Sequence, residues 1–158
     1  MKNPKAVLLF VAFACLGVIG AALYMQHAKD MAPCPWCVIQ RYCFLLVALI
    51  CLIAAAFPRG ATRAGAGVGM LAALGGAGSA SWHLWVKAHP EVSCGIDPLE
   101  TSLNKIPPAE LMPYLFKADG FCTTEYPPLL GLSIPQWSLL SFLVFAIVLG
   151  TVAFRRAR

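Results

Sequence analysis

Residues 34–57 read CPWCVIQRYCFLLVALICLIAAAF, a pair of cysteines followed by an almost unbroken apolar run. The run from Val38 to Phe57 is about 20 residues long, the length that an α-helix needs to cross the hydrocarbon core of a bilayer. Only Gln40 and Arg41 interrupt it, and Pro-Arg-Gly at 58–60 ends it with helix-breaking residues and a charge. This stretch therefore predicts a transmembrane helix with two cysteines at its start.

Three further apolar runs complete the hydrophobic pattern. The four predicted spans cover residues 6–24, 38–57, 64–86 and 136–154. With 59% hydrophobic and only 12% charged residues, the chain is too apolar for a soluble domain, in which roughly 25% of residues are charged. We therefore predict an all-α membrane protein: one domain over residues 1–158, built as a bundle of four transmembrane helices, with loops at 25–37 and 87–135.

Three segments each admit two interpretations. The run at 6–24 is also compatible with a cleaved signal peptide, but its length exceeds the roughly 7–15 residues of a signal core, so we read it as a span. The run at 64–86 is rich in glycine and serine, and small residues let helices approach closely in lipid. Residues 111–116 form an apolar patch that would either lie flat on the membrane surface or form a turn of buried helix.

The distribution of charge predicts the orientation, because lysine and arginine near the ends of spans collect on the cytoplasmic side. The lysines and arginines in the short flanks of the predicted spans fall on one side: Lys2, Lys5, Arg59, Arg63, Arg155, Arg156 and Arg158. All seven acidic residues lie in the two opposite loops. Both termini are therefore predicted to be cytoplasmic and both loops to face the other compartment. The net charge of +5 then reflects topology, and no nucleic-acid partner is expected.

Cys34 and Cys37 enclose Pro35 and Trp36 where the first outer loop meets the second span. The N-terminus of a helix carries a partial positive charge, which stabilises a thiolate. Two cysteines at this spacing are able to close a disulfide and to expose one sulfur to attack, as redox pairs do. Half of a zinc site and an inert structural bridge are the alternatives.

Cys94 and Cys122 form a second pair in the long outer loop. A disulfide between them would close a loop of about thirty residues, and it would either exchange electrons or act as a structural staple. Two pairs on one face of the membrane favour a relay by disulfide exchange. Zinc is less favoured, because cysteines 28 positions apart lack the second tight knuckle of common structural sites.

Arg41 and His83 are the other candidate site residues. Arg41 lies four positions after Cys37 on one helix face, inside an apolar span where a charge is costly and marks a candidate functional site. It would polarise a carbonyl of a bound electron acceptor or, alternatively, extend to the outer surface. His83, near the outer end of the third span, would donate a hydrogen bond to the same acceptor or be an interfacial histidine with no such role.

The remaining cysteines and the tryptophans have simpler interpretations. Within apolar spans free cysteine behaves as a small hydrophobe, so no catalysis is assigned to Cys15, Cys43 and Cys51. The tryptophans at span ends are assigned to the aromatic belt of the membrane surface: Trp82, Trp85 and Trp137.

These motifs resemble the disulfide bond formation protein B (DsbB) family over nearly the whole chain. The resemblance rests on four predicted spans and on Pro-Cys-Pro-Trp-Cys-Val-Ile-Gln-Arg at 33–41. It also rests on His83 ahead of Cys94, on Gly-Phe-Cys at 120–122, and on Leu-Gly-Leu-Ser-Ile-Pro-Gln-Trp at 130–137.

The resemblance implies a role for each candidate residue. The catalytic cysteines would be a membrane-proximal pair and a partner-facing pair: Cys34 with Cys37, and Cys94 with Cys122. Arg41 matches a quinone-contacting arginine, and His83 matches a second residue of the quinone site. No metal is expected.

The function that the resemblance implies is a quinone-dependent thiol–disulfide oxidoreductase of the bacterial inner membrane, with its active loops in the periplasm. It would reoxidise a periplasmic DsbA-like thiol oxidase and pass the electrons to ubiquinone or menaquinone. Two alternatives stay open. One is a paralogous oxidase that serves a single dedicated partner, and the other is a structural or metal-binding four-helix membrane protein.

Overall fold

The long helices lie close to the predicted apolar runs. The computed structural model describes residues 3–89, 98–120, 124 and 126–154. Its helices are α1 (Pro4–Ala28), α2 (Pro35–Ala56), α3 (Arg59–Ala88), α4 (Pro98–Asn104), α5 (Pro107–Leu111), α6 (Pro113–Phe116) and α7 (Ile134–Phe154). The described residues contain no β-strand, only one isolated bridge between Leu129 and Leu132. The predicted all-helical class is confirmed.

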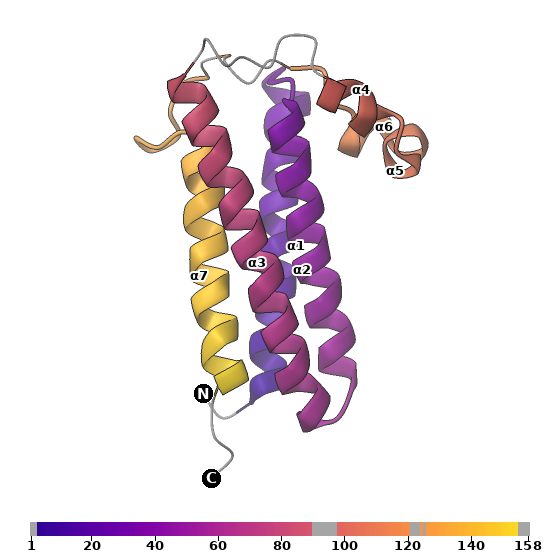
Figure 1. Ribbon diagram of the computed structural model, residues 1–158, viewed down its shortest axis with the longest axis vertical. Coiled ribbons are helices and arrows are strands. Elements are labelled where there is room, and N and C mark those ends of the chain that lie inside the picture. Colours follow the sequence, from indigo (N-terminus) through magenta and orange to yellow (C-terminus); the bar gives the residue numbers. More distant parts are fainter. Residues whose placement is uncertain (1–2, 90–97, 121–123, 125, 155–158) are drawn as a thin grey trace.

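Helices α1, α2, α3 and α7 run side by side as a bundle (Figure 1). The short helices α4, α5 and α6 project sideways at one end, beside α1 and α2. We call this the loop end, because it holds the starts of α2 and α7 and the ends of α1 and α3. The start of α1, the end of α7 and the connection from α2 to α3 lie together at the opposite end.

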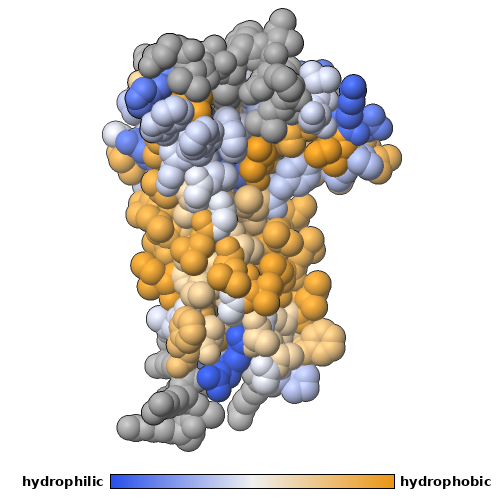
Figure 2. Space-filling model, viewed as in Figure 1, coloured by the Kyte–Doolittle hydropathy of each residue, from blue (hydrophilic) through white to orange (hydrophobic). Residues whose placement is uncertain are grey.

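Three helices, α1, α2 and α7, are long and apolar enough to cross a membrane. At 30 residues α3 is the longest helix, but its many glycines and serines make it less apolar, and it does not meet the same criterion. Three of the four predicted spans are thus candidate membrane helices by length and composition, and the count of four stays a prediction. On the face that Figure 2 shows, apolar residues cover the middle of the bundle, and more hydrophilic residues lie toward the loop end.

Small residues bring α3 close to its neighbours, as predicted. The ring of Phe142 in α7 lies against Gly76 of α3 and leaves no room for a Cβ atom there. The same ring stacks on Phe44 of α2, with centroids 3.9 Å apart. Gly75 and Gly78 instead have open space around the position of a Cβ atom. The packing role therefore belongs to particular glycines and not to the whole run.

The apolar segment 111–116 is partly buried and partly exposed, and its predicted contact with the membrane surface stays a prediction. Phe116 of α6 is buried and stacks on Tyr42 of α2, with ring centroids 4.4 Å apart and an interplanar angle of 7°. Leu111 and Tyr114 point outward, with 79% and 76% of their surface exposed. The segment is therefore anchored on the bundle at Phe116, and it presents apolar side chains outward at the other two positions.

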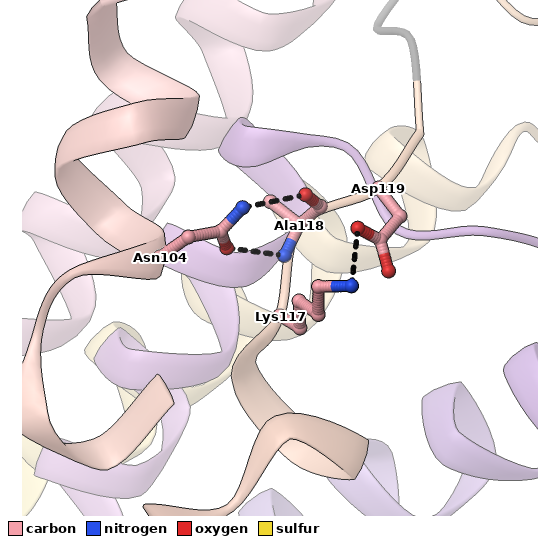
Figure 3. A network of polar contacts seen from close by, with 4 residues as sticks. All are labelled: Asn104, Lys117, Ala118 and Asp119. Atoms are coloured by element: carbon pink, nitrogen blue, oxygen red, sulfur yellow. Dashed lines mark hydrogen bonds and ion pairs between the residues drawn. The ribbon is translucent and has the colours of Figure 1, made fainter. Parts of the chain in front are cut away.

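Polar contacts fix the chain that follows α6 (Figure 3). The side-chain amide of Asn104 donates to the carbonyl of Ala118 at 3.0 Å, and its oxygen accepts from the Ala118 N–H at 2.9 Å. Lys117 and Asp119 form an ion pair at 3.2 Å with both side chains about half exposed. Exposed pairs contribute little stability. The paired amide contacts therefore do more to hold residue 118 in place, directly before the segment that reaches the cysteine pair.

Candidate active site

The first cysteine pair lies at the start of α2, as the sequence predicts. Cys34 is the N-cap residue, and its sulfur accepts a hydrogen bond from the N–H of Cys37 at 3.4 Å. Pro35 occupies the first helical turn, where its missing N–H costs nothing. The sulfurs of Cys34 and Cys37 are 2.9 Å apart. Both sulfurs thus sit at the positive end of the helix dipole, an environment that favours thiolates.

The imidazole of His83 in α3 lies beside this cysteine pair. Its Nε2 lies 3.5 Å from the sulfur of Cys34, and its Nδ1 lies 3.3 Å from Nε2 of Gln40 in α2. Only 2% of the surface of His83 and 3% of that of Gln40 is exposed. The sequence predicted His83 near an electron acceptor. The structure places it directly against the cysteine pair, with Gln40 behind it.

Arg41 is turned into the protein, with 6% of its surface exposed. Its Nη1 donates to Oε1 of Gln26 in α1 and to the carbonyl of Leu115 in α6, both at 2.7 Å. The alternative in which this side chain extends to the outer surface is wrong for this structure. A buried guanidinium needs hydrogen-bond acceptors, and here α1 and α6 supply them.

One pocket joins these groups. Its empty volume is about 750 Å³, including the part that is open to solvent, and it lies among α1, α2, α3 and α7 at the loop end. Cys34, Cys37, Arg41 and His83 all line it. The remaining wall is mostly apolar and includes the following side chains: Val18, Ile19, Ala22, Met25, Phe44 and Ile134. An apolar cleft with a few convergent polar groups is the usual form of a small-molecule site.

Tyr126 and Lys87 add polar groups to the pocket wall. The hydroxyl of Tyr126 donates to the carbonyl of Ala32 at 3.1 Å. Burial raises the pKa of Tyr126, and negative charge on Cys37 and Cys34 raises it further, while the bond to Ala32 acts in the opposite direction. This hydroxyl therefore stays protonated at neutral pH and remains a hydrogen-bond donor.

Cys94 and Cys122 lie outside the described residues, so their pairing stays a prediction. The described chain before Cys122 is held against the first pair. The N–H groups of Asp119 and Gly120 both donate to the carbonyl of Pro33, at 3.1 and 3.0 Å. At Gly120 a Cβ atom would collide with the backbone of Ala32, so only glycine allows this approach.

The other cysteines lie in the apolar part of the bundle, as the sequence predicts. Cys15 and Cys51 belong to the apolar core of the bundle, and Cys43 packs against it. Trp82 and Trp85 are partly exposed near the end of α3 and stack with centroids 4.9 Å apart. Their place in an aromatic belt stays a prediction.

Gln26, Gln40 and Tyr126 are site residues that the sequence interpretation missed. Gln40 was noticed only as an interruption of the apolar run, although a polar side chain within a span is itself a signal of function. Gln26 and Tyr126 carry no such signal, because they lie at the edge of a span and in a loop.

A metal ion is the chemical alternative at this site. Within the part of the chain that the structure describes, Cys34, Cys37 and His83 are the only group whose candidate ligand atoms, within 4.8 Å of one another, could hold one. Two thiolates on one tetrahedral zinc ion, each at about 2.3 Å, would be about 3.8 Å apart. The 2.9 Å between these sulfurs is shorter. Zinc binding would therefore require the two sulfurs to move apart.

Comparison with known proteins agrees with this chemistry. Residues 4–152 match the family model for disulfide bond formation protein DsbB. A disulfide bond formation protein B from Herminiimonas arsenicoxydans is 58% identical over 156 residues, which cover 99% of both chains. Disulfide bond formation protein B 1 from Pseudomonas syringae pv. syringae (strain B728a) is 43% identical over 159 residues, 100% of this chain and 94% of the relative. The Ralstonia nicotianae protein named disulfide bond formation protein B is 42% identical over 157 residues, 99% and 98% of the two chains.

Proposed function

Because the chain belongs to the disulfide bond formation protein B (DsbB) family, we propose that it reoxidises a periplasmic DsbA-like dithiol oxidase and passes the electrons to a membrane quinone. The observation that carries this proposal is the pocket at the loop end. It brings a cysteine pair, a buried arginine and a buried histidine to one apolar cleft. Family membership supports disulfide formation in general, and the pocket supports the particular acceptor.

The pocket residues fit a quinone, which is a flat apolar ring with two carbonyl acceptors. Phe44, Val18 and Ile19 offer apolar walls, while Arg41 carries five N–H donors. A bound ubiquinone or menaquinone would supply the two-electron acceptor of the reaction. Arg41 would donate to it and His83 would line its pocket, with Cys37 as the sulfur beside it.

The cysteines then work as a relay. A thiolate of the reduced partner attacks Cys94 of the Cys94–Cys122 disulfide and releases Cys122 as a thiolate. Cys122 attacks Cys34, which forms a Cys34–Cys122 disulfide and releases Cys37 as a thiolate. The second thiol of the partner resolves the mixed disulfide, and the partner leaves oxidised with Cys94 released as a thiolate. Cys94 next attacks Cys122, which restores the outer disulfide and releases Cys34 as a thiolate. Cys34 and Cys37 would then close their disulfide as a bound quinone accepts the two electrons from Cys37.

Contacts of the described residues support the exchange between loops. Gly120 and Tyr126, on either side of Cys122, are hydrogen-bonded to Pro33 and Ala32, directly before Cys34. These contacts hold the described residues on both sides of position 122 beside the first pair, which supports Cys34 as the sulfur that Cys122 attacks.

The proposal also assigns a topology. We place four spans in the bacterial inner membrane, with α3 as the fourth, because α3 lies in the same bundle and at about 1.5 Å per residue is long enough to cross it. Both termini would be cytoplasmic and the loop end periplasmic. The basic residues beside the opposite end support this orientation.

The experiment is anaerobic. Purified protein is mixed with a reduced periplasmic dithiol oxidase and a soluble quinone analogue, and the quinone absorbance is followed for the wild type and for Cys37→Ser. The proposal predicts loss of quinone only when Cys37 is present. If the wild type consumes no quinone while its outer cysteines stay bridged or carry a metal, the structural alternative replaces it.

A dedicated partner is the alternative within the same chemistry. No described contact distinguishes a general thiol oxidase partner from a single specialised one. The same assay separates them when it is repeated with several reduced partners: similar rates indicate the general role, and turnover with one partner alone indicates a paralogue.

A further inference from the structure

A chain of buried polar contacts runs from Gln40 through His83 to the sulfur of Cys34. The contact distances are 3.3 Å between Gln40 Nε2 and His83 Nδ1, and 3.5 Å between His83 Nε2 and Cys34 Sγ. All three side chains are nearly inaccessible to solvent. Burying the amide of Gln40 is costly unless it is hydrogen-bonded, so its contact with His83 is a strong constraint on the imidazole.

The direction of these hydrogen bonds determines where His83 carries its proton. An amide nitrogen only donates, so Gln40 Nε2 donates to His83 Nδ1, which must accept. A neutral imidazole with an accepting Nδ1 carries its hydrogen on Nε2. That hydrogen faces the sulfur of Cys34, where it is able to donate to a thiolate.

We propose that Gln40 is a positioning residue, which holds neutral His83 in the Nε2–H form so that His83 donates a hydrogen bond to the Cys34 thiolate as that sulfur becomes a leaving group. The step in question rests on the proposed relay. Cys94 attacks Cys122, the Cys94–Cys122 bond forms, the Cys34–Cys122 bond breaks, and the electron pair goes to the sulfur of Cys34. No proton moves in this step.

A stabilised leaving thiolate speeds disulfide exchange, because thiols of lower pKa leave faster. Several other groups act on the same sulfur. Arg41 of α2 and Lys87 of α3 bring positive charge to the pocket, and Cys37 and Tyr126 are its other titratable neighbours. Loss of the Gln40 amide is therefore expected to destabilise the Cys34 thiolate only in part. The helix N-terminus and the two cations still stabilise that thiolate in a Gln40 variant.

The test measures the thiolate directly, without quinone or partner. In full-length protein that carries Ser at 37, 94 and 122, the rate of alkylation of Cys34 by iodoacetamide is followed against pH by peptide mass spectrometry. Gln40→Met keeps the length of the side chain and removes the amide. It should raise the apparent pKa of Cys34 by about one unit, a roughly tenfold loss of thiolate at a given pH below the pKa. Thr62→Val, which removes a buried hydroxyl at the far end of α3, is the matched control and should leave the pKa unchanged.

A second measurement needs no Gln40 variant. Histidine labelled with nitrogen-15 in the wild type reports the tautomer of His83, whose signals are identified by their loss in His83→Gln. The proposal predicts a hydrogen on Nε2. A hydrogen on Nδ1, or a Gln40→Met protein with the pKa of its parent, would overturn it. If the proposed oxidase function is wrong, the result is different: the wild type consumes no quinone, whichever nitrogen of His83 carries the hydrogen.

Discussion

Two groups of cysteines lie in the same bundle, and burial does not distinguish them. Cys34 at the loop end is 3% exposed, and Cys15 and Cys51 in the middle of the bundle are fully buried. The difference lies in their neighbours. Cys34 contacts the start of a helix, a second sulfur and an imidazole, whereas Cys15 and Cys51 lie in the apolar core. A cysteine becomes reactive through the charges and donors around it, so the loop end is the part of the bundle equipped for thiol chemistry.

The two groups of cysteines should differ most when one sulfur is removed from each. Cys34→Ser or Cys37→Ser should reduce thiol-dependent quinone reduction by roughly a thousandfold or more, as loss of a catalytic nucleophile does. Cys15→Ala and Cys51→Ala should retain most activity, because they remove only packing atoms. Initial rates of quinone loss at equal protein concentration provide the measurement. Equal losses in both groups would show that the core cysteines also carry electrons.

Two arginines at opposite ends of the bundle extend the comparison. Arg41→Ala removes two hydrogen bonds at 2.7 Å and a buried charge from the pocket. At about 1.5–3 kcal/mol for a charged hydrogen bond, we expect the KM for quinone to rise at least tenfold. Arg63, which donates to the carbonyl of Ala153 at the opposite end, is the matched control. Arg63→Ala should leave the KM unchanged. Normal quinone kinetics in Arg41→Ala would remove Arg41 from the site.

The middle of the bundle should respond in stability rather than in chemistry. Gly76→Ala places a methyl group against the ring of Phe142, and such overpacking costs about 1–3 kcal/mol. Gly75→Ala, one position away, meets open space and should be tolerated. Thermal unfolding in detergent is the measurement, and a lower Tm is expected only for the change at Gly76. Equal Tm values would mean that the two helices separate easily at this contact.

The anchoring of α6 is expected to give a smaller and local effect. Phe116→Ala removes the stacked contact with Tyr42, while Tyr114→Ala changes an exposed ring. Loss of a packed aromatic side chain should increase amide hydrogen exchange over residues 98–118 and leave α2 protected. Tyr114→Ala should exchange like the wild type in that segment. Equal protection in both variants would show that Asn104 alone holds the segment.

The smallest expected effect belongs to Tyr126. Tyr126→Phe removes one hydrogen bond to Ala32, worth about 1 kcal/mol, and keeps the ring. If that contact aligns the segment around Cys122 with Cys34, oxidation of the partner should slow by a few fold at saturating quinone. Single-turnover reoxidation of the partner is the measurement. A change in the KM for quinone alone would assign Tyr126 to the pocket instead of the exchange.

The sequence predicted the helices better than the contacts between them. Apolar runs located α1, α2 and α7 because spanning a bilayer requires a fixed length of apolar chain. The sequence interpretation assigned α4, α5 and α6 to one long loop, although a proline stands at the first residue of each of these helices. Proline fits that position as well as it fits a loop, so composition alone does not separate the two.

Within the site, the sequence located the first pair and Arg41 but not the partners that orient them. Arg41 contacts Gln26 and Leu115, which are 15 and 74 positions away along the chain. Such pairs depend on how α1 and α6 pack on α2, which periodicity does not report. The sequence predicted His83 near an electron acceptor but did not predict its contact with Cys34. The depth of a residue in a span is readable from sequence, but its neighbour on the next helix is not.

The most direct test of the central claim maps the state of each thiol in the wild-type chain. The protein is reduced, exposed anaerobically to a soluble quinone analogue, alkylated in denaturant and analysed by peptide mass spectrometry. The account predicts that Cys34 and Cys37 become protected from alkylation on addition of quinone, while Cys15 and Cys51 stay fully alkylated. Protection of the core cysteines, or no change at Cys34 and Cys37, would contradict it.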